Sequence, residues 1–156
     1  MIENLPLYIV VVFIITTLLT VGIFQFAIKR GSFSSRTAKF LNFILPFWLI
    51  LQATEAVTGF YRVTDTLPPR LVAFALFPAT LLIIGLFIFS REFVGKLPLK
   101  ILTIIHLIRI PVELVLLWLF QHGQVPQLMT FEGRNFDILS GITAPIIAWL
   151  AFRNGQ

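Results

Sequence analysis

The sequence predicts an all-α, polytopic membrane protein with about five transmembrane helices. Of its 156 residues, 58% are hydrophobic and only 12% are charged, whereas an ordinary soluble domain carries about twice that charged fraction. Several separate apolar runs exceed the ~18 residues that a helix needs to cross the hydrocarbon of a bilayer. We therefore expect a single integral membrane domain over residues 1–156, with the lipid bilayer as its surroundings.

Five apolar runs define the expected helices, at residues 5–28, 40–61, 70–90, 99–120 and 136–152. The first begins near Pro6, which suits a first helical turn because its missing N–H is not needed there. No basic segment precedes this run and no small-residue cleavage site follows it, so we expect it to be kept rather than removed as a signal peptide. The fifth run barely spans a ~30 Å hydrocarbon core at ~1.5 Å per residue, and it could begin inside a re-entrant loop.

Basic residues lie mainly on one side of the expected helices. That side holds Lys29, Arg30, Arg36, Lys39, Arg91, Lys96, Lys100 and Arg153. The opposite loops hold Arg62, Arg70 and Arg134. Because Lys and Arg accumulate on the cytoplasmic side, we expect the N-terminus outside and the C-terminus inside, as an odd number of helices requires. The net charge of +5 thus reflects topology, and the lack of a continuous basic face argues against a nucleic-acid partner.

The run at residues 99–120 carries three polar side chains where few are expected: His106, Arg109 and Glu113. At about 100° per residue they fall within a ~60° sector of one helix face. An arginine at the centre of a membrane helix costs roughly 2.5 kcal/mol or more, so it usually faces a partner or a cavity. We therefore expect Arg109 to contact a carboxylate, either that of Glu113 or that of Glu55.

The run at residues 40–61 adds a second polar face at a similar depth in the outer half of the membrane. Its stripe consists of Trp48, Gln52, Glu55, Gly59 and Arg62. Gly59 would let another helix or a ligand approach the backbone closely. We expect Gln52 and Glu55 to join His106, Arg109 and Glu113 in one intramembrane pocket.

Polar residues also precede the last run, namely Glu132, Arg134, Asn135 and Asp137. Asn135 or Asp137 would cap the last helix by accepting hydrogen bonds from its first N–H groups. Alternatively, the segment would lie with Arg62 at the outer mouth and cover the pocket, since polar groups at membrane depth need protein or water beside them.

No recognisable catalytic or cofactor motif accompanies the pocket. The absence of cysteine excludes disulfides, thiolate catalysis and cysteine-held clusters. The two histidines, His106 and His122, lie about 24 Å apart along one helix and cannot share a metal. We therefore assign no catalytic residue, metal or cofactor.

Three functions remain open for the polar cluster. In the first, the protein binds or translocates a small polar solute, ion or proton: Arg109 holds an anionic group or neutralises the carboxylates, and Glu55 and Glu113 bind an ion or carry a proton. In the second, the same residues fix helix packing or meet a partner, in a homo-oligomer or as a subunit of a membrane complex. In the third, paired carboxylates serve an intramembrane enzyme. The sequence favours the first function over the enzyme.

Two segments in the last third of the chain resemble a group of small multi-pass bacterial membrane proteins without an assigned function: HLIRIPVELVLLWLF and MTFEGRNFDILSGITAP. The resemblance implies a helical architecture in the bacterial inner membrane and implies no activity. Members of that group continue with further helices, so it also implies that this chain is a short relative or a piece of a longer protein, in which another helix would complete the site.

Overall fold

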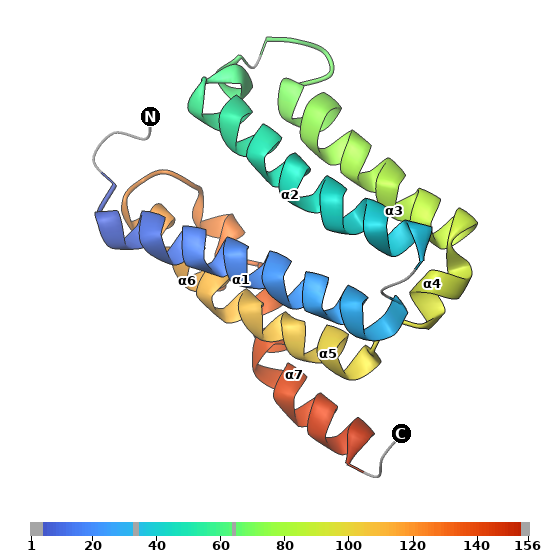
Figure 1. The fold of residues 1–156 in the computed structure, drawn as a ribbon. Helices are drawn as coiled ribbons and strands as arrows, with labels where there is room; N and C mark the ends of the chain where they lie inside the picture. Colours follow the sequence, from blue (N-terminus) through green and yellow to red (C-terminus); the bar gives the residue numbers. More distant parts are fainter. Residues whose placement is uncertain (1–4, 33–34, 64, 154–156) are drawn as a thin grey trace. The chain divides into compact units, whose positions relative to one another are not determined.

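The structure is a computed structural model that describes residues 5–32, 35–63 and 65–153, and these residues form helices joined by turns without any strand (Figure 1). The α-helices are α1 (Leu7–Ser32), α2 (Arg36–Val57), α3 (Phe77–Phe89), α4 (Arg91–Gly95), α5 (Leu99–Ile104), α6 (Arg109–Gln121) and α7 (Asp137–Phe152). The 3-10 turns are η1 (Phe60–Arg62), η3 (Ile105–Ile108) and η4 (Gln127–Met129), and η2 (Val72–Leu76) is a π-type segment. The predicted all-α class is confirmed.

Among the residues that the structure describes, four helical stretches are long and apolar enough to cross a membrane: Leu7–Gly31, Arg36–Val57, Val72–Phe89 and Leu99–Gln121. The last helix, α7, is apolar but has only 16 residues, which at ~1.5 Å per residue is shorter than a ~30 Å hydrocarbon core. Four helices suited to a membrane are therefore present, while a fifth span and the orientation of the chain stay predictions.

Helix α2 begins earlier and ends earlier than the sequence pattern indicated. It begins at Arg36, because the hydroxyl oxygen of Ser35 accepts a hydrogen bond from the backbone N–H of Ala38 at 2.9 Å and so caps the first turn. It ends at Val57, and Gly59 follows with φ +78°, the left-handed conformation in which many helices stop. The expected continuation of the polar stripe to Gly59 and Arg62 is therefore wrong.

The chain divides into two compact units. The first, here called the central unit, comprises Ile28–Leu97 and contains α2, η1, η2, α3 and α4. The second, the terminal unit, combines α1 up to Ala27 with the described residues after Leu97, which form α5, η3, α6, η4 and α7. The two polar faces that the sequence analysis combined belong to different units.

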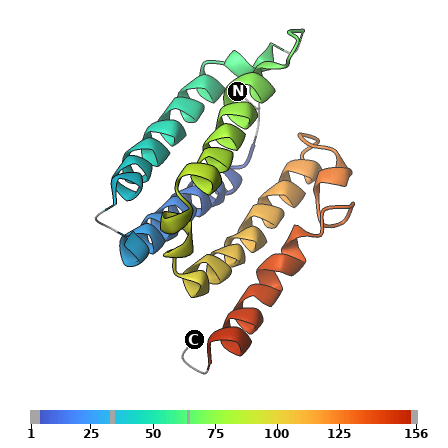
Figure 2. The same cartoon turned by 90° about the vertical axis from the view of Figure 1, so that its right-hand side faces the viewer.

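In the central unit, α2 and α3 run side by side (Figures 1 and 2) and are linked by hydrogen bonds at two levels. The hydroxyls of Thr37 and Ser90 lie 3.2 Å apart at one level. At the other, the side-chain amide of Gln52 donates to the carbonyl of Phe74 at 3.3 Å. Because Pro78 has no N–H, the Phe74 carbonyl lacks the usual α-helical donor four residues on. Gln52 supplies that carbonyl with a donor.

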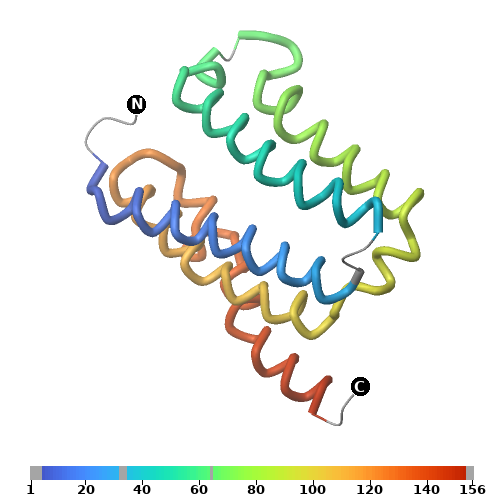
Figure 3. Tube along the Cα trace, viewed as in Figure 1, coloured from blue at the N-terminus to red at the C-terminus, as the bar shows by residue number. Residues whose placement is uncertain are grey.

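In the terminal unit, α5, η3 and α6 follow one another as a single rod of helical turns, and α1 runs beside it (Figure 3). The rings of Tyr8 and Trp118 meet edge to face with their centroids 5.1 Å apart, a contact between the start of α1 and the last turns of α6. On the other side α7 approaches closely at Gly141, where a Cβ would lie only 3.2 Å from the backbone oxygen of His106. A glycine at this contact allows two helices to meet through their backbones.

Candidate functional site

The buried carboxylate of Glu113 is the centre of a polar cluster in the terminal unit. Glu113 is only 1% exposed on α6. Its Oε1 accepts a hydrogen bond from Asn135 Nδ2 at 2.6 Å. Within the described part of the chain, its Oε2 is buried and has no hydrogen-bond partner. The sequence singled out both residues, and the structure brings them together.

Asn135 connects three elements through one side chain. Besides Glu113 on α6, its Nδ2 donates to the backbone carbonyl of Met129 in η4 at 3.1 Å. Its Oδ1 accepts from the backbone N–H of Asp137, the first residue of α7, at 3.2 Å. The two acceptors, Glu113 Oε1 and the Met129 carbonyl, lie at the amide nitrogen of Asn135, and the donor, the Asp137 N–H, lies at its amide oxygen. One orientation of the amide group therefore makes all three bonds. Asn135 thus accepts a hydrogen bond from the first N–H group of the last helix, as expected, but it does so from the residue before the N-cap, since the N-cap is Phe136 and makes no side-chain cap bond.

The turn that presents Asn135 depends on Gly133 and Thr130. A Cβ on Gly133 would lie 2.3 Å from the carbonyl oxygen of Gln127, so only glycine fits where these two backbone segments meet. Thr130 is fully buried and donates its hydroxyl to the same carbonyl at 2.9 Å. Its own carbonyl accepts from the backbone N–H groups of Gly133 and Asn135. The loop is thus ordered around Asn135.

Arg109 contacts a carboxylate, as expected, but that carboxylate belongs to Asp137. Its Nη1 lies 2.5 Å from Asp137 Oδ2, and the two side chains are 37% and 56% exposed. The expectation that the partner would be Glu113 or Glu55 therefore needs correction. Glu113 is held by Asn135, and Glu55 takes part in hydrogen bonds within the central unit. The signal for Asp137 was its position at the start of α7, which meets the face of α6 that carries Arg109.

His106 extends the cluster to a cavity in the same unit. Its Nδ1 accepts a hydrogen bond from Arg109 Nε at 3.2 Å. The imidazole also lines an open cavity of about 350 Å³, together with Thr103, Ser140 and Thr143. Hydrogen bonds and one ion pair thus connect His106, which lines this partly apolar cavity, to Arg109, Asp137, Asn135 and Glu113.

The second cluster lies in the central unit and consists of Gln52, Glu55 and Tyr61. The Tyr61 hydroxyl hydrogen-bonds with Glu55 Oε2 and lies 2.5 Å from Gln52 Oε1. The Gln52 amide nitrogen lies 3.4 Å from the same Glu55 oxygen. Tyr61 was not among the predicted site residues, because the predicted helix ran to residue 61 whereas α2 ends at Val57. The signal was Gly59, which ends the helix and turns the chain so that Tyr61 faces back toward Glu55.

The pKa of Tyr61 reflects these surroundings. Burial is the largest cause of a rise from the ordinary value of 10.0 to about 12, and the hydrogen bond to Glu55 and the charge of that carboxylate add to it. Tyr61 follows the Arg36–Val57 stretch and lies outside the helices suited to span a membrane. Its hydroxyl therefore remains a proton donor over the whole physiological pH range.

Within the described ranges, the other candidates for the outer mouth take no part in the side-chain hydrogen bonds of either cluster. Arg62, Glu132 and Arg134 are exposed. Among the residues that the structure describes, no group of three or more His, Asp and Glu side chains is placed to hold a metal ion.

Comparisons of the chain with protein-family models, with curated proteins and with solved structures give no match. Function is therefore inferred from the chemistry of the two clusters.

We expect Asn135→Ala to destabilise the protein by at least about 1–3 kcal/mol, because it leaves the buried Glu113 carboxylate without its donor. Arg134→Ala, one residue away and exposed, should change stability little. Thermal unfolding in detergent measures both. In the double variant Glu113→Ala, Asn135→Ala the two effects should not add, because each change removes the hydrogen bond between the two side chains. Additive effects would show that the bond contributes nothing.

We expect the absorbance of tyrosinate from Tyr61, obtained as wild type minus Tyr61→Phe, to appear with a midpoint near pH 12. Because the folded pKa is raised, the stabilisation that accompanies it is present below pH 10 and is lost as the pH rises toward 12. Glu55→Gln should lower this midpoint, since it removes the negative charge. An unchanged midpoint in Glu55→Gln would show that the carboxylate does not act on Tyr61.

Proposed function

We propose that this protein is a multi-pass membrane protein that binds a proton or a small cation at Glu113 and carries it across the bilayer. The observation that supports the proposal is a carboxylate with 1% exposure and one unpartnered oxygen within the described residues. An ionised carboxylate in a low-dielectric interior is costly unless it is compensated. A proton or a cation on Oε2 would compensate it, and Asn135 would hold Oε1 in either state.

The arrangement of Arg109 narrows the choice of solute. Its guanidinium already forms an ion pair with Asp137, which favours a cationic over an anionic solute at the neighbouring carboxylate. The same pairing disfavours an acid–base enzyme, because Asp137, the second carboxylate of the cluster, is already engaged. The Arg109–Asp137 pair therefore supports a role in binding or transport.

Access from water is the second requirement for transport. The side chains of Arg109 and Asp137 are 37% and 56% exposed, and charges at this depth need water or protein beside them rather than lipid. The cavity of about 350 Å³ carries the imidazole of His106 and three hydroxyl side chains. We infer that water enters this cavity and reaches the ion pair next to Glu113.

The orientation that we propose has the N-terminus outside and the C-terminus in the cytoplasm, in the bacterial inner membrane. Two contacts in the central unit support it. A Cβ on Gly31 would lie 2.5 Å from the carbonyl oxygen of Lys96, and Thr37 hydrogen-bonds with Ser90. They bring the basic residues around the start of α2 to the same end of the unit as those of α4. Basic residues at one end agree with the positive-inside rule.

We expect Glu113→Gln to abolish flux in proteoliposomes while leaving the folded yield nearly intact, because Gln keeps the shape of Glu and an acceptor oxygen for Asn135 but not the titratable charge. A dye that senses internal pH reports proton movement under an imposed potential, and Na⁺ or K⁺ gradients report cation movement. Glu92→Gln, which changes an exposed carboxylate of α4, is the matched control. Glu55→Gln tests the second cluster in the same assay.

Melting temperatures of the same preparations separate transport from a purely structural role. A large loss of melting temperature in Glu113→Gln, with a proportionate loss of flux, would favour a packing role. Unchanged flux in Glu113→Gln would contradict the proposal directly.

We expect Glu132→Cys to react with a membrane-impermeant maleimide in intact cells and Glu92→Cys to react only after permeabilisation. Both positions are exposed, and the chain has no natural cysteine. A cysteine appended after Gln156 should be protected in intact cells if α7 crosses the membrane. Labelling of Glu92→Cys but not Glu132→Cys from outside would show that the orientation is the opposite one. Labelling of the appended cysteine from outside would show that the chain crosses the membrane four times.

A further inference from the structure

A polar pocket lies at the basic end of the central unit, apart from either cluster described above. Its volume is about 210 Å³, and its polar lining comprises Ser35, Thr37, Ser90, Arg91, Glu92 and Lys96. Ser35 and Thr37 stand at the first turn of α2, a helix of 22 residues, whose N-terminal N–H groups and dipole favour an anion. The pocket therefore combines hydroxyl groups, basic side chains and the positive end of a helix.

An apolar groove of about 410 Å³ adjoins this pocket and runs between α2 and α3. Thr37 and Ser90 line both the pocket and the groove. The groove continues over Phe40, Leu82 and Gly85. A Cβ on Gly85 would meet no atom within 4 Å, so the missing side chain leaves open space there rather than a helix contact.

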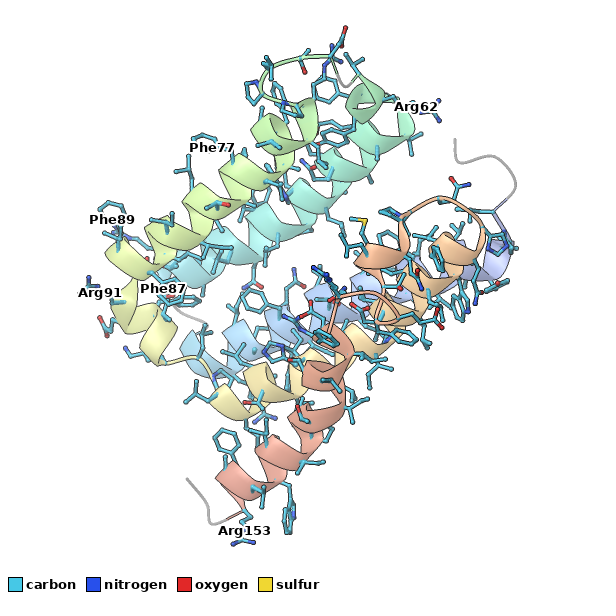
Figure 4. The ribbon with its side chains drawn as sticks, turned by 180° about the vertical axis from the view of Figure 1, so that it is seen from behind. Arg62, Phe77, Phe87, Phe89, Arg91 and Arg153 are labelled. Carbon is cyan, nitrogen blue, oxygen red and sulfur yellow. The ribbon has the colours of Figure 1, made fainter. Side chains whose placement is uncertain are left out.

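The charges around the pocket favour an anionic occupant. Six basic residues belong to this end of the central unit: Lys29, Arg30, Arg36, Lys39, Arg91 and Lys96. Against them stands Glu92, which pairs with Lys96 at 2.5 Å. Clusters of about four to eight basic residues beside a membrane span are typical of sites for anionic lipids. Figure 4 shows Arg91 and the exposed Phe89 together at this end of α3, an aromatic and basic pair suited to the membrane surface.

We propose that an anionic phospholipid binds here, with its phosphate in the pocket and one acyl chain in the groove. Thr37 and Ser90 share a single hydrogen bond of 3.2 Å, so one hydroxyl hydrogen of the pair is left to donate to a phosphate oxygen. Arg91 uses its Nε to donate to the carbonyl of Phe87 at 3.3 Å, and its terminal nitrogens can turn to the phosphate. A free phosphate would use the pocket but not the groove. The site requires a membrane-embedded chain but is independent of any transport at Glu113.

The test uses the whole protein in detergent, with phosphatidylglycerol, phosphatidylcholine and inorganic phosphate as separate probes. Native mass spectrometry counts bound lipid, and thermal unfolding measures stabilisation. Wild type should bind phosphatidylglycerol in preference to phosphatidylcholine. Arg91→Gln should lower the affinity for phosphatidylglycerol about fivefold. This factor corresponds to about 1 kcal/mol per basic side chain near an anionic surface.

Gly85→Leu separates the groove from the pocket. The added side chain has room in the open space at Gly85, so it should fill the groove without disturbing the fold. It should therefore lower the affinity for phosphatidylglycerol. Gly22→Leu places the same side chain at another open glycine, on α1, and should leave lipid binding unchanged. The proposal would be overturned if the protein bound both lipids equally. It would also be overturned if inorganic phosphate stabilised the protein as much as phosphatidylglycerol does and Gly85→Leu did not change that stabilisation.

Discussion

The hydrogen bond between Asn135 and Glu113 is the interaction on which the terminal unit most depends. It joins the buried carboxylate of α6 to a loop that also reaches η4 and the start of α7. In an apolar environment a polar group that loses its partner cannot turn to water, so each bond of Asn135 constrains the others. The position of Asp137 beside Arg109 follows from this constraint, because Asn135 fixes the backbone from which Asp137 extends.

Apolar length alone predicts the helices, because the requirement that a membrane helix satisfy its own backbone leaves few alternatives. The first, third and fourth runs therefore end within a few residues of their predicted limits. The boundaries of α2 depend on local chemistry instead. The cap formed by Ser35 makes α2 begin about one turn earlier than predicted. The positive φ of Gly59 makes it end about one turn earlier than predicted. Hydropathy is insensitive to either effect.

The candidate site was predictable in its members but not in its pairings. Helical spacing placed His106 and Arg109 on one face, and the structure joins them by a hydrogen bond. The partner of Arg109 could not be derived from spacing, because Asp137 comes from another helix whose approach depends on Gly141 and on the loop around Gly133. Tyr61 was missed for a related reason. It lies beyond the end of α2, so helical spacing cannot predict which residues it contacts. Long-range pairings need the turns to be known first.

If the short last helix crosses the bilayer, as proposed, its length has a consequence for the lipid around it. A helix of 16 residues set across a bilayer is shorter than the hydrocarbon thickness, and the lipid adapts to such a mismatch by thinning locally. Thinning beside α7 would lower the water surface toward the first turn of that helix, where Asp137 and Arg109 are paired. Lipid deformation, rather than a channel through the protein, would then shorten the distance from bulk water to the buried carboxylate.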